Sequence, residues 1–316
     1  MLKLFATLWR ILQKKIKRVR ILPKIKRRGE LMLKVLARAK INLTLDILGI
    51  RADGYHEVSM IMQMIELADE LELKKISSGI NLKMDATEII GGEKIPTYEK
   101  NLAWRAAIEF QKFCGKNLGV SIELKKKIPA AAGLAGGSAD AAAVIRGMNR
   151  LYETNLTQKE LCTIGERIGS DVPFCIIGGM CLAEGRGEIL TQLAPVKKFN
   201  VVLAKPSGEI STAWAYKNYD ANPAKNHPPN RKIIEQFNRG DYDAAFKNFS
   251  NVLEGVALKK IPEIADCKRK MLLAGAKVAL MSGSGPTVFA LTDDALTAEK
   301  IAAEVEAAQI FITKFH

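Results

Sequence analysis

The chain contains 316 residues, of which 48% are hydrophobic and 26% are charged. This composition is typical of globular proteins, and it excludes a disordered, collagen-like or disulfide-scaffold protein. The formal net charge is +14 at pH 7, but residues 1–31 hold six Lys and five Arg against one Glu and so carry +10 of it. Since the rest of the chain is nearly balanced, we expect no nucleic-acid partner.

Cysteine and histidine usage bears on metal sites and on the cell compartment. The five cysteines form no Cys-x-x-Cys pair, and the chain has three histidines. An odd number of unpatterned cysteines is typical of a reducing compartment and argues against structural zinc. We therefore expect a cytoplasmic protein without a metal centre built from its own side chains.

The basic N-terminal segment, residues 1–31, has the pattern of an amphipathic helix. Its apolar residues recur at helical spacing up to Pro23. It lacks the features of a secretory signal or transit peptide, and no apolar run in the chain approaches the ~20 residues of a membrane span. One interpretation is an arm that contacts a membrane surface or binds nucleic acid. The other, which we favour, is an upstream extension with Met32 as the functional start, because Met32 directly precedes the first predicted strand.

Strands and helices are predicted to alternate after Met32. Residues 35–47 have alternating apolar and polar positions and predict a strand with Lys40 and Asn42 on its polar face. The other predicted elements are a turn at Asp53-Gly54, an apolar segment 56–67, a helix 101–113 capped by Asn101, a strand 120–125, a helix after residue 138, and a helix opened by a Thr157/Glu160 capping box and ended by Gly169. This mixture predicts an α+β protein, with domains at 32–192 and 193–316.

A glycine-rich segment, residues 129–142, joins the strand 120–125 to the following helix. Exposed N–H groups and the positive end of a helix dipole suit phosphate at such a junction. Neither a Walker A loop nor the dinucleotide fingerprint is present. From these residues alone, a phosphate site and a flexible loop capped by Ser138 are equally supported.

Two shorter segments also carry polar groups that suit chemistry. In Gly169–Phe174, Asp171 follows a predicted helix end, and Pro173 is expected to hold Val172 extended. A fixed carboxylate there would accept a proton from a hydroxyl, although an ordinary turn aspartate is the simpler interpretation. Residues 281–287 place two glycines and two serines before a strand, which suits either a ligand loop or a plain hairpin.

Taken together and in this order, the three segments resemble a known superfamily. Pro129-x-x-x-Gly-Leu-x-Gly-Gly-Ser-x-Asp-Ala-Ala142 resembles the ATP-binding motif of the GHMP kinases, and Ser282-Gly-Ser-Gly-Pro-Thr287 resembles their C-terminal glycine motif. Residues 39–43 and 51–57 are similar to segments of one family within it, the 4-diphosphocytidyl-2-C-methyl-D-erythritol kinases, and Gly169–Phe174 fits the same family. The resemblance runs from Met32 to about Phe311.

The resemblance implies a fold and a reaction. The expected fold is a two-domain GHMP kinase, with an N-terminal domain like domain 2 of ribosomal protein S5 and a ferredoxin-like C-terminal domain. The expected reaction moves the ATP γ-phosphate, with Mg²⁺, to the 2-hydroxyl of a cytidine-diphosphate substrate in isoprenoid precursor synthesis. Another GHMP kinase and a non-catalytic nucleotide-binding protein on this fold remain the alternatives.

Residue roles follow from the same resemblance. Asp171 would take the hydroxyl proton, and Lys40 would neutralise charge and favour the ionised form of Asp171. Tyr55 and His56 match positions that hold the cytosine ring, and Tyr216 aligns with an aromatic on its other side. The expected ATP residues are Pro129, Ala130, Ala131, Ala132, Gly133, Leu134, Ala135, Gly136, Gly137, Ser138 and Ala139, with Asn101 and Lys126 at the adenosine end; the expected substrate residues are Asn42, Asp53, Tyr55, His56 and Tyr216.

Overall fold

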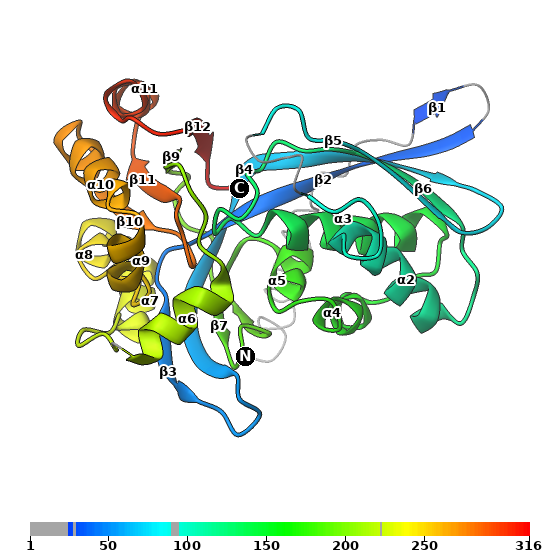
Figure 1. Cartoon of the computed structure of the whole chain (residues 1–316), viewed down its shortest axis with the longest axis horizontal. Coiled ribbons are helices and arrows are strands. Elements are labelled where there is room, and N and C mark those ends of the chain that lie inside the picture. The colour runs from blue at the N-terminus through cyan, green and yellow to red at the C-terminus, as the bar shows by residue number, and fades with distance from the viewer. Residues whose placement is uncertain (1–24, 28–29, 90–94, 222) are drawn as a thin grey trace, which may run out of the picture.

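The computed structural model describes residues 25–27, 30–89, 95–221 and 223–316. Within them the chain forms two sheets, each with its own layer of helices (Figure 1). The larger sheet runs β1-β2-β4-β6-β5, with β3 and β7 also paired to β4, and β8 paired to β7. Its strands are β1 (Ile25–Arg27), β2 (Glu30–Asn42), β3 (Asp46–Ile50), β4 (His56–Lys75), β5 (Ile80–Asp85), β6 (Val120–Lys125), β7 (Met180–Glu184) and β8 (Ile189–Gln192).

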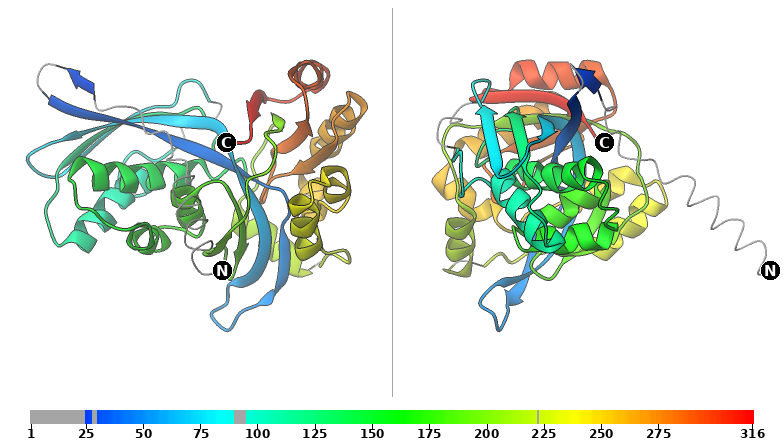
Figure 2. Two further views of the ribbon diagram at one scale, coloured as in Figure 1. Left: turned by 180° about the vertical axis from the view of Figure 1, so that it is seen from behind. Right: turned by 90° about the vertical axis from the view of Figure 1, so that its right-hand side faces the viewer.

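A layer of helices covers one face of the larger sheet (Figures 1 and 2). Helix α3 packs on β2 and β4, while α2 and α5 pack on α3. The apolar stripe of α3 is buried, as its helical spacing predicts: Ala141, Val144, Ile145, Met148 and Leu151. The bounds of this layer are α2 (Leu102–Cys114), α3 (Gly136–Leu151), α4 (Gln158–Glu166) and α5 (Asp171–Ile177).

The smaller sheet has the ferredoxin-like arrangement. Its four strands are antiparallel in the order β10-β11-β9-β12, which is 2-3-1-4 in chain order. The strands are β9 (Asn200–Lys205), β10 (Val278–Met281), β11 (Val288–Thr292) and β12 (Gln309–Lys314), and the helices are α6 (Thr212–Ala221), α7 (Asn230–Asn238), α8 (Tyr242–Phe246), α9 (Glu254–Lys260), α10 (Glu263–Leu273) and α11 (Ala295–Glu304). The predicted α+β, two-domain fold is confirmed, and 32–192 and 193–316 remain our proposed domain limits.

Several local predictions are confirmed. Strand β6 has the predicted bounds, and the Asn101 side chain caps α2 by accepting a hydrogen bond from the Ala103 N–H at 2.8 Å. The Thr157/Glu160 capping box is present in both directions at the start of α4. These predictions hold because each depends on residues within one turn of the chain.

The predicted strand 35–47 is wrong near its end, because the chain breaks after Asn42 and resumes as β3 at Asp46. Thr44 leaves the ladder, and its hydroxyl accepts from the Ile61 N–H and donates to Asn230 Oδ1 at 2.6 Å. The polar face is also not solvent-exposed, since Lys40, Asn42 and Thr44 are at most 4% exposed. A strand that lies between two domains buries both of its faces, and alternation alone does not reveal this.

The expected extended conformation of Val172 is also wrong. Asp171 and Val172 belong to α5, which begins at Asp171 rather than following a helix as a turn. Pro173 lies in the first turn of this helix, where a backbone N–H would have no intrahelical acceptor, so its ring costs little. Asp171 is therefore held at a helix start.

The predicted N-terminal helix falls on residues outside the described part of the chain. The prediction that Met32 directly precedes the first strand is wrong, because Met32 lies inside β2, which begins at Glu30, and Ile25–Arg27 pairs with the first residues of β2 as β1. Among the described residues, no helix is long and apolar enough to cross a membrane.

Candidate active site

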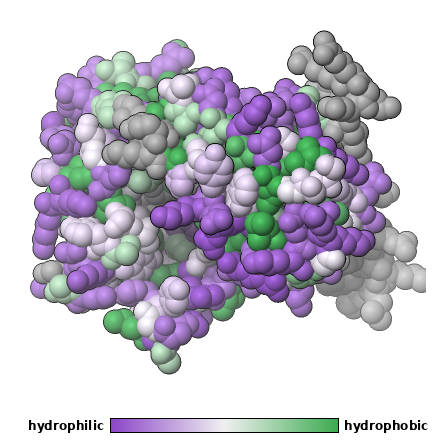
Figure 3. All heavy atoms as spheres, turned by 45° about the vertical axis from the view of Figure 1, so that its right-hand side comes forward, coloured by the Kyte–Doolittle hydropathy of each residue, from purple (hydrophilic) through white to green (hydrophobic). Residues whose placement is uncertain are grey.

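A cleft of about 1000 Å³ lies between the two sheets and their helices. The surface is hollowed at this place (Figure 3). The cleft lining includes residues from β2, the start of β4, the starts of α2, α5 and α6, and two loops. We call residues 129–138 the glycine loop and residues 281–287 the hairpin loop, since the latter joins the antiparallel strands β10 and β11.

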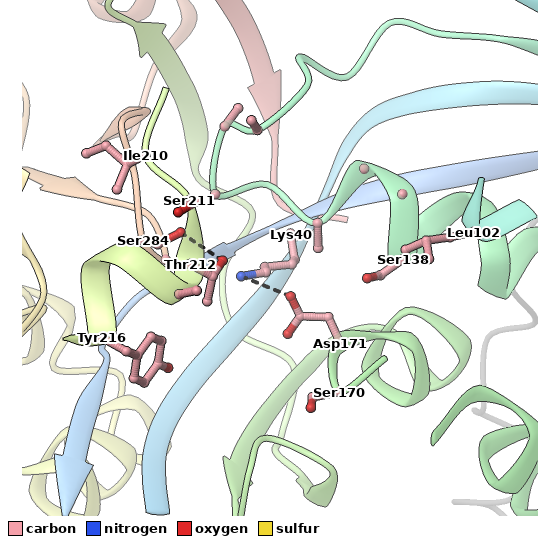
Figure 4. A pocket seen from close by; sticks show the side chains of 18 of the residues that line it. Lys40, Leu102, Ser138, Ser170, Asp171, Ile210, Ser211, Thr212, Tyr216 and Ser284 are labelled. Atoms are coloured by element: carbon pink, nitrogen blue, oxygen red, sulfur yellow. Dashed lines mark hydrogen bonds and ion pairs between the residues drawn. The ribbon is translucent and has the colours of Figure 1, made fainter. Parts of the chain in front are cut away.

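Lys40 and Asp171 face each other in this cleft (Figure 4). Lys40 Nζ lies 3.7 Å from Asp171 Oδ2 and donates to Asn42 Oδ1 at 2.5 Å. The Lys40 side chain is 5% exposed, whereas that of Asp171 is 30% exposed. A register shift in β2 between Arg38 and Lys40 precedes the lysine, and such bulges re-aim side chains. A fixed cation thus lies beside a carboxylate that is open to the cleft.

The glycine loop ends at a helix start without a side-chain cap. Ala135, at φ +55°, occupies the N-cap position of α3, and no side chain bonds to it. The alternative of a loop capped by Ser138 is therefore wrong. Within the described part of the chain, no side chain caps the first N–H groups of α3, so they can bind a ligand, and the helix dipole adds positive potential there. Of the predicted ATP residues, Leu134 and Ala139 are buried outside the cleft lining, whereas Pro129–Gly133 and Ala135–Ser138 line it.

The hairpin loop packs directly against the glycine loop. Ser282 Oγ donates to the Gly133 carbonyl at 2.9 Å and accepts from the Asn42 N–H at 3.2 Å. Gly133 has φ +74°, and a Cβ atom there would lie 2.1 Å from the Ser282 carbonyl oxygen. Asn251 donates to the carbonyls of Met281 and Gly283 at 2.9 and 2.8 Å. This loop is therefore a hairpin, as one interpretation held, and it also lines the cleft.

Lys126 lies in a buried charge cluster. Its ammonium donates to Asp69 and to Asp140, the latter at 2.6 Å, and all three residues are at most 3% exposed. Burial, which outweighs the Lys126 charge, raises the pKa of Asp140, while the two carboxylates outweigh burial and raise the pKa of Lys126. Lys126 reaches the cleft lining with its ammonium already engaged. Asn101 also lines the cleft, with its side chain bonded to Ala103 N–H and to the Pro96 carbonyl.

An aromatic group lies at the other end of the cleft. The rings of His56 and Tyr216 lie 4.7 Å apart at 52°, and His56 Nε2 lies 2.8 Å from Asp220 Oδ1. Burial, with the Asp171 charge, raises the pKa of Tyr216, so its hydroxyl stays protonated. Tyr55 is 57% exposed beside them. Asp53 is not part of the cleft lining; it accepts from the Tyr55 N–H at 3.1 Å and holds the turn.

Comparison with known proteins places this site in a family. Residues 101–179 match the GHMP kinases N terminal domain, and residues 233–310 match the GHMP kinases C terminal model. Proteins named 4-diphosphocytidyl-2-C-methyl-D-erythritol kinase from Bacillus pumilus and Clostridium beijerinckii are 48% and 44% identical, over 81% and 89% of this chain and 86% and 99% of their own lengths. The chain belongs to this kinase family.

Solved structures agree with this assignment. A crystal structure of 4-(cytidine 5'-diphospho)-2C-methyl-D-erythritol kinase superposes with a TM-score of 0.75 at 32% identity, covering 90% of this chain and all of the other. Homoserine kinase from Cytophaga hutchinsonii, at 20% identity and a TM-score of 0.69 over 93% of this chain and 98% of its own, shares the fold.

Some cleft residues of this 4-diphosphocytidyl-2-C-methyl-D-erythritol kinase family member escape sequence reasoning. Arg186, Lys217 and Asp220 line the cleft at its aromatic end. Asp220 has a signal, because it follows Tyr216 by one helical turn and so shares its face. Arg186 lies in a Gly-Arg-Gly turn, a pattern that carries no functional signal on its own.

Proposed function

We propose that this chain transfers the γ-phosphate of ATP to the 2-hydroxyl of 4-diphosphocytidyl-2-C-methyl-D-erythritol, a step in isoprenoid precursor synthesis. The observation that carries the proposal is the position of the Lys40–Asp171 pair. Lys40 Nζ and Asp171 Oδ2 lie 3.7 Å apart. The pair lies between the uncapped start of α3 and the His56–Tyr216 group. The Asp171 carboxylate is thus flanked by a site suited to phosphate and by a site suited to the cytosine ring.

The glycine loop would hold the ATP phosphates. The free N–H groups at the start of α3 are donors aimed at an anion, and phosphoryl transfer depends mainly on such positioning and charge stabilisation. Gly136 and Gly137 let the start of α3 pack closely on its neighbours, since a Cβ at Gly136 would lie 3.1 Å from Ile128 and one at Gly137 would lie 3.2 Å from Leu102. The adenosine would extend toward Asn101, at the start of α2. Lys126 supports this end by tying β6 to α3 through Asp140.

Asp171 would accept the proton of the substrate hydroxyl as the phosphate is transferred. Its partial exposure gives the hydroxyl access, and Lys40 lies close enough to neutralise charge that builds on the transferred group. Asn42 holds the Lys40 ammonium in place through its Oδ1. Retention of this pair supports a catalyst rather than a nucleotide-binding protein without activity.

The aromatic end would hold the cytosine ring. Tyr55, His56 and Tyr216 offer flat surfaces for stacking, and Asp220 fixes the His56 ring by accepting from Nε2–H. The substrate hydroxyl would then reach Asp171 from this side, opposite the ATP.

The residues present fit Mg²⁺ that is bound mainly by ATP. Among the described residues, no group of three or more His, Cys, Asp or Glu side chains is arranged to hold a metal. The cleft therefore suits an ion whose ligands are largely phosphate oxygens and water. The Ser138 hydroxyl, at the start of α3, would be one protein ligand (Figure 4). When bound, the ion would neutralise phosphate charge.

An acceptor panel tests the function. The purified chain is given ATP, Mg²⁺ and one of four alcohols: the cytidine substrate, homoserine, mevalonate or galactose, and ADP release is followed. We expect turnover with the cytidine substrate at least about 10³-fold above the others, and its loss in excess EDTA. Preference for any other alcohol would overturn the proposal.

A further inference from the structure

Five cationic side chains line the cleft within the described residues, namely Lys40, Lys100, Lys126, Arg186 and Lys217. Lys40 pairs with Asp171, and Lys126 is held by Asp69 and Asp140. Lys100 precedes Asn101 at the opposite, α2 end of the cleft. Arg186 and Lys217 therefore remain as cations toward the aromatic end.

Backbone hydrogen bonds hold Arg186 in place, which leaves its guanidinium able to bind a ligand. It lies in the turn between β7 and β8, where its N–H donates to Glu188 Oε2 at 2.6 Å. The neighbouring Gly185 N–H donates to Glu57 Oε1 at 3.1 Å. The Nε atom lies 3.6 Å from Glu188 Oε1, and the guanidinium charge also acts on Asp53, while its terminal nitrogens donate no hydrogen bond to the described residues. The side chain is 36% exposed.

The guanidinium lies over an aromatic ring of the same site. Its central carbon is 5.1 Å from the Tyr55 ring centroid, a cation–π contact. The turn also approaches the reacting groups, because a Cβ on Gly187 would lie 2.8 Å from Met60 and 3.9 Å from the Ser170 side chain, next to Asp171. Arg186 thus contacts Tyr55 from a turn that also approaches Ser170, the neighbour of Asp171.

We propose that Arg186 binds the diphosphate of the cytidine substrate, while the aromatic group binds its base. This inference rests on the proposed function and names a residue for the part of the substrate that neither the aromatic rings nor Asp171 can hold. A planar guanidinium with free N–H groups bonds two phosphate oxygens at once, whereas Lys217 presents only a point charge. Contact with Tyr55 keeps the side chain oriented before the substrate arrives.

Calorimetry with cytidine, CMP and CDP separates base binding from phosphate binding. In the full wild-type chain, affinity should rise stepwise with phosphate number. In Arg186→Ala, the dissociation constant of CDP should rise about ten- to a hundredfold, the usual weight of hydrogen bonds to a charged group, while that of cytidine changes less than twofold. The KM for ATP should also change less than twofold.

Three further variants sharpen the comparison. Arg186→Lys should recover only part of the CDP affinity, since it restores the charge but not the paired donors. Tyr55→Ala should weaken cytidine itself, by roughly the 1–3 kcal/mol of a stacked base, or about ten- to a hundredfold. Lys217→Ala should leave most of the gain from cytidine to CDP in place.

Several outcomes would overturn the assignment of Arg186. These are an unchanged CDP affinity in Arg186→Ala, an equal loss for cytidine and CDP, or loss of the phosphate gain in Lys217→Ala instead. Each would leave the kinase function standing if the wild-type chain still phosphorylates the cytidine substrate. A wild-type chain that neither binds CDP nor turns over would overturn both proposals.

Discussion

Asp171 differs from the other acidic side chains of the cleft in how it is held. Among the described residues, Asp140 is buried against Lys126 and Asp220 is bonded to His56. Asp171 has the Lys40 ion pair at 3.7 Å as its side-chain contact and remains 30% exposed. Of these carboxylates, it is the one that is both open to the cleft and paired with the buried Lys40 ammonium.

We expect Asp171→Asn to fold normally and to lose kcat by about 10²–10⁴, the usual contribution of a general base. The amide keeps the size of the side chain and loses its basicity. Steady-state kinetics with a melting curve checks this, and Asp220→Asn serves as a matched control that should act on the KM for the cytidine substrate. Near-normal kcat in Asp171→Asn would make the residue structural.

At the scale of elements, the contact between the glycine loop and the hairpin loop joins the two domains across the cleft. We expect Gly133→Ala to separate these loops, because its Cβ would lie 2.1 Å from a carbonyl oxygen at a φ of +74°. The backbone strain alone costs about 1–2 kcal/mol, and the displaced loop should weaken ATP binding as well.

Gly255→Ala is the matched control for this variant. Gly255 lies in α9 with nothing within 4 Å of an added Cβ, so alanine there should raise stability by about 0.5–1 kcal/mol. Denaturant unfolding and ATP titration measure both variants. Equal stability of the two alanine variants would contradict the proposed contact.

The elements show which features the sequence could predict. Local spacing predicts the helix caps, Asn101 and the Thr157/Glu160 box, and the strand at residues 120–125. The break at Thr44 depends instead on Asn230, which is 186 residues away in the chain. The residues around Thr44 cannot predict a partner this far away in the sequence.

The candidate site shows the same division. Lys40 and Asp171 were found through motif resemblance, and the structure brings them together. The engagement of Lys126 by Asp69 and Asp140, and the approach of Arg186 to Tyr55, depend on how β4, β6 and the β7–β8 turn meet. These contacts are long-range in sequence and became visible only in the folded chain.

At the scale of the whole molecule, buried thiols predict a stability loss in alkali. Burial raises the pKa of Cys175 and Cys181 to about 12 and that of Cys267 to about 11, from an ordinary value near 9. Above pH 9 the unfolded chain ionises these thiols and the folded chain does not, so folding stability falls as pH rises.

We expect the free energy of unfolding to drop by roughly 1 kcal/mol per thiol between pH 9 and pH 10. Urea unfolding at pH 8, 9 and 10 measures the slope. Cys175→Ala should flatten it, although the cavity it leaves lowers stability at every pH. A slope that is the same in wild type and variant would show that Cys175 is not protected from ionisation.

The N-terminal segment, residues 1–31, precedes every motif of the site in the sequence. We expect a chain that begins at Met32 to fold and to keep full kinase activity, although it loses the β1 pairing with the start of β2. The basic residues 1–31 should give the full-length chain alone a salt-sensitive affinity for anionic vesicles, at about 1 kcal/mol per residue near the surface.

Kinase assays and vesicle sedimentation on both lengths check these expectations. An inactive or insoluble Met32 chain would show that residues 1–31 belong to the fold. Equal vesicle binding by both lengths would place any membrane contact elsewhere.

The most direct test of the central claim is the product itself. The purified chain is incubated with ATP, Mg²⁺ and 4-diphosphocytidyl-2-C-methyl-D-erythritol, and the product is examined by phosphorus NMR with proton and carbon correlation. We expect a new phosphate monoester coupled to carbon 2 of the methylerythritol, formed at a rate that Asp171→Asn reduces by at least about 10². ATP consumption without that monoester, or the same rate in Asp171→Asn, would contradict the account.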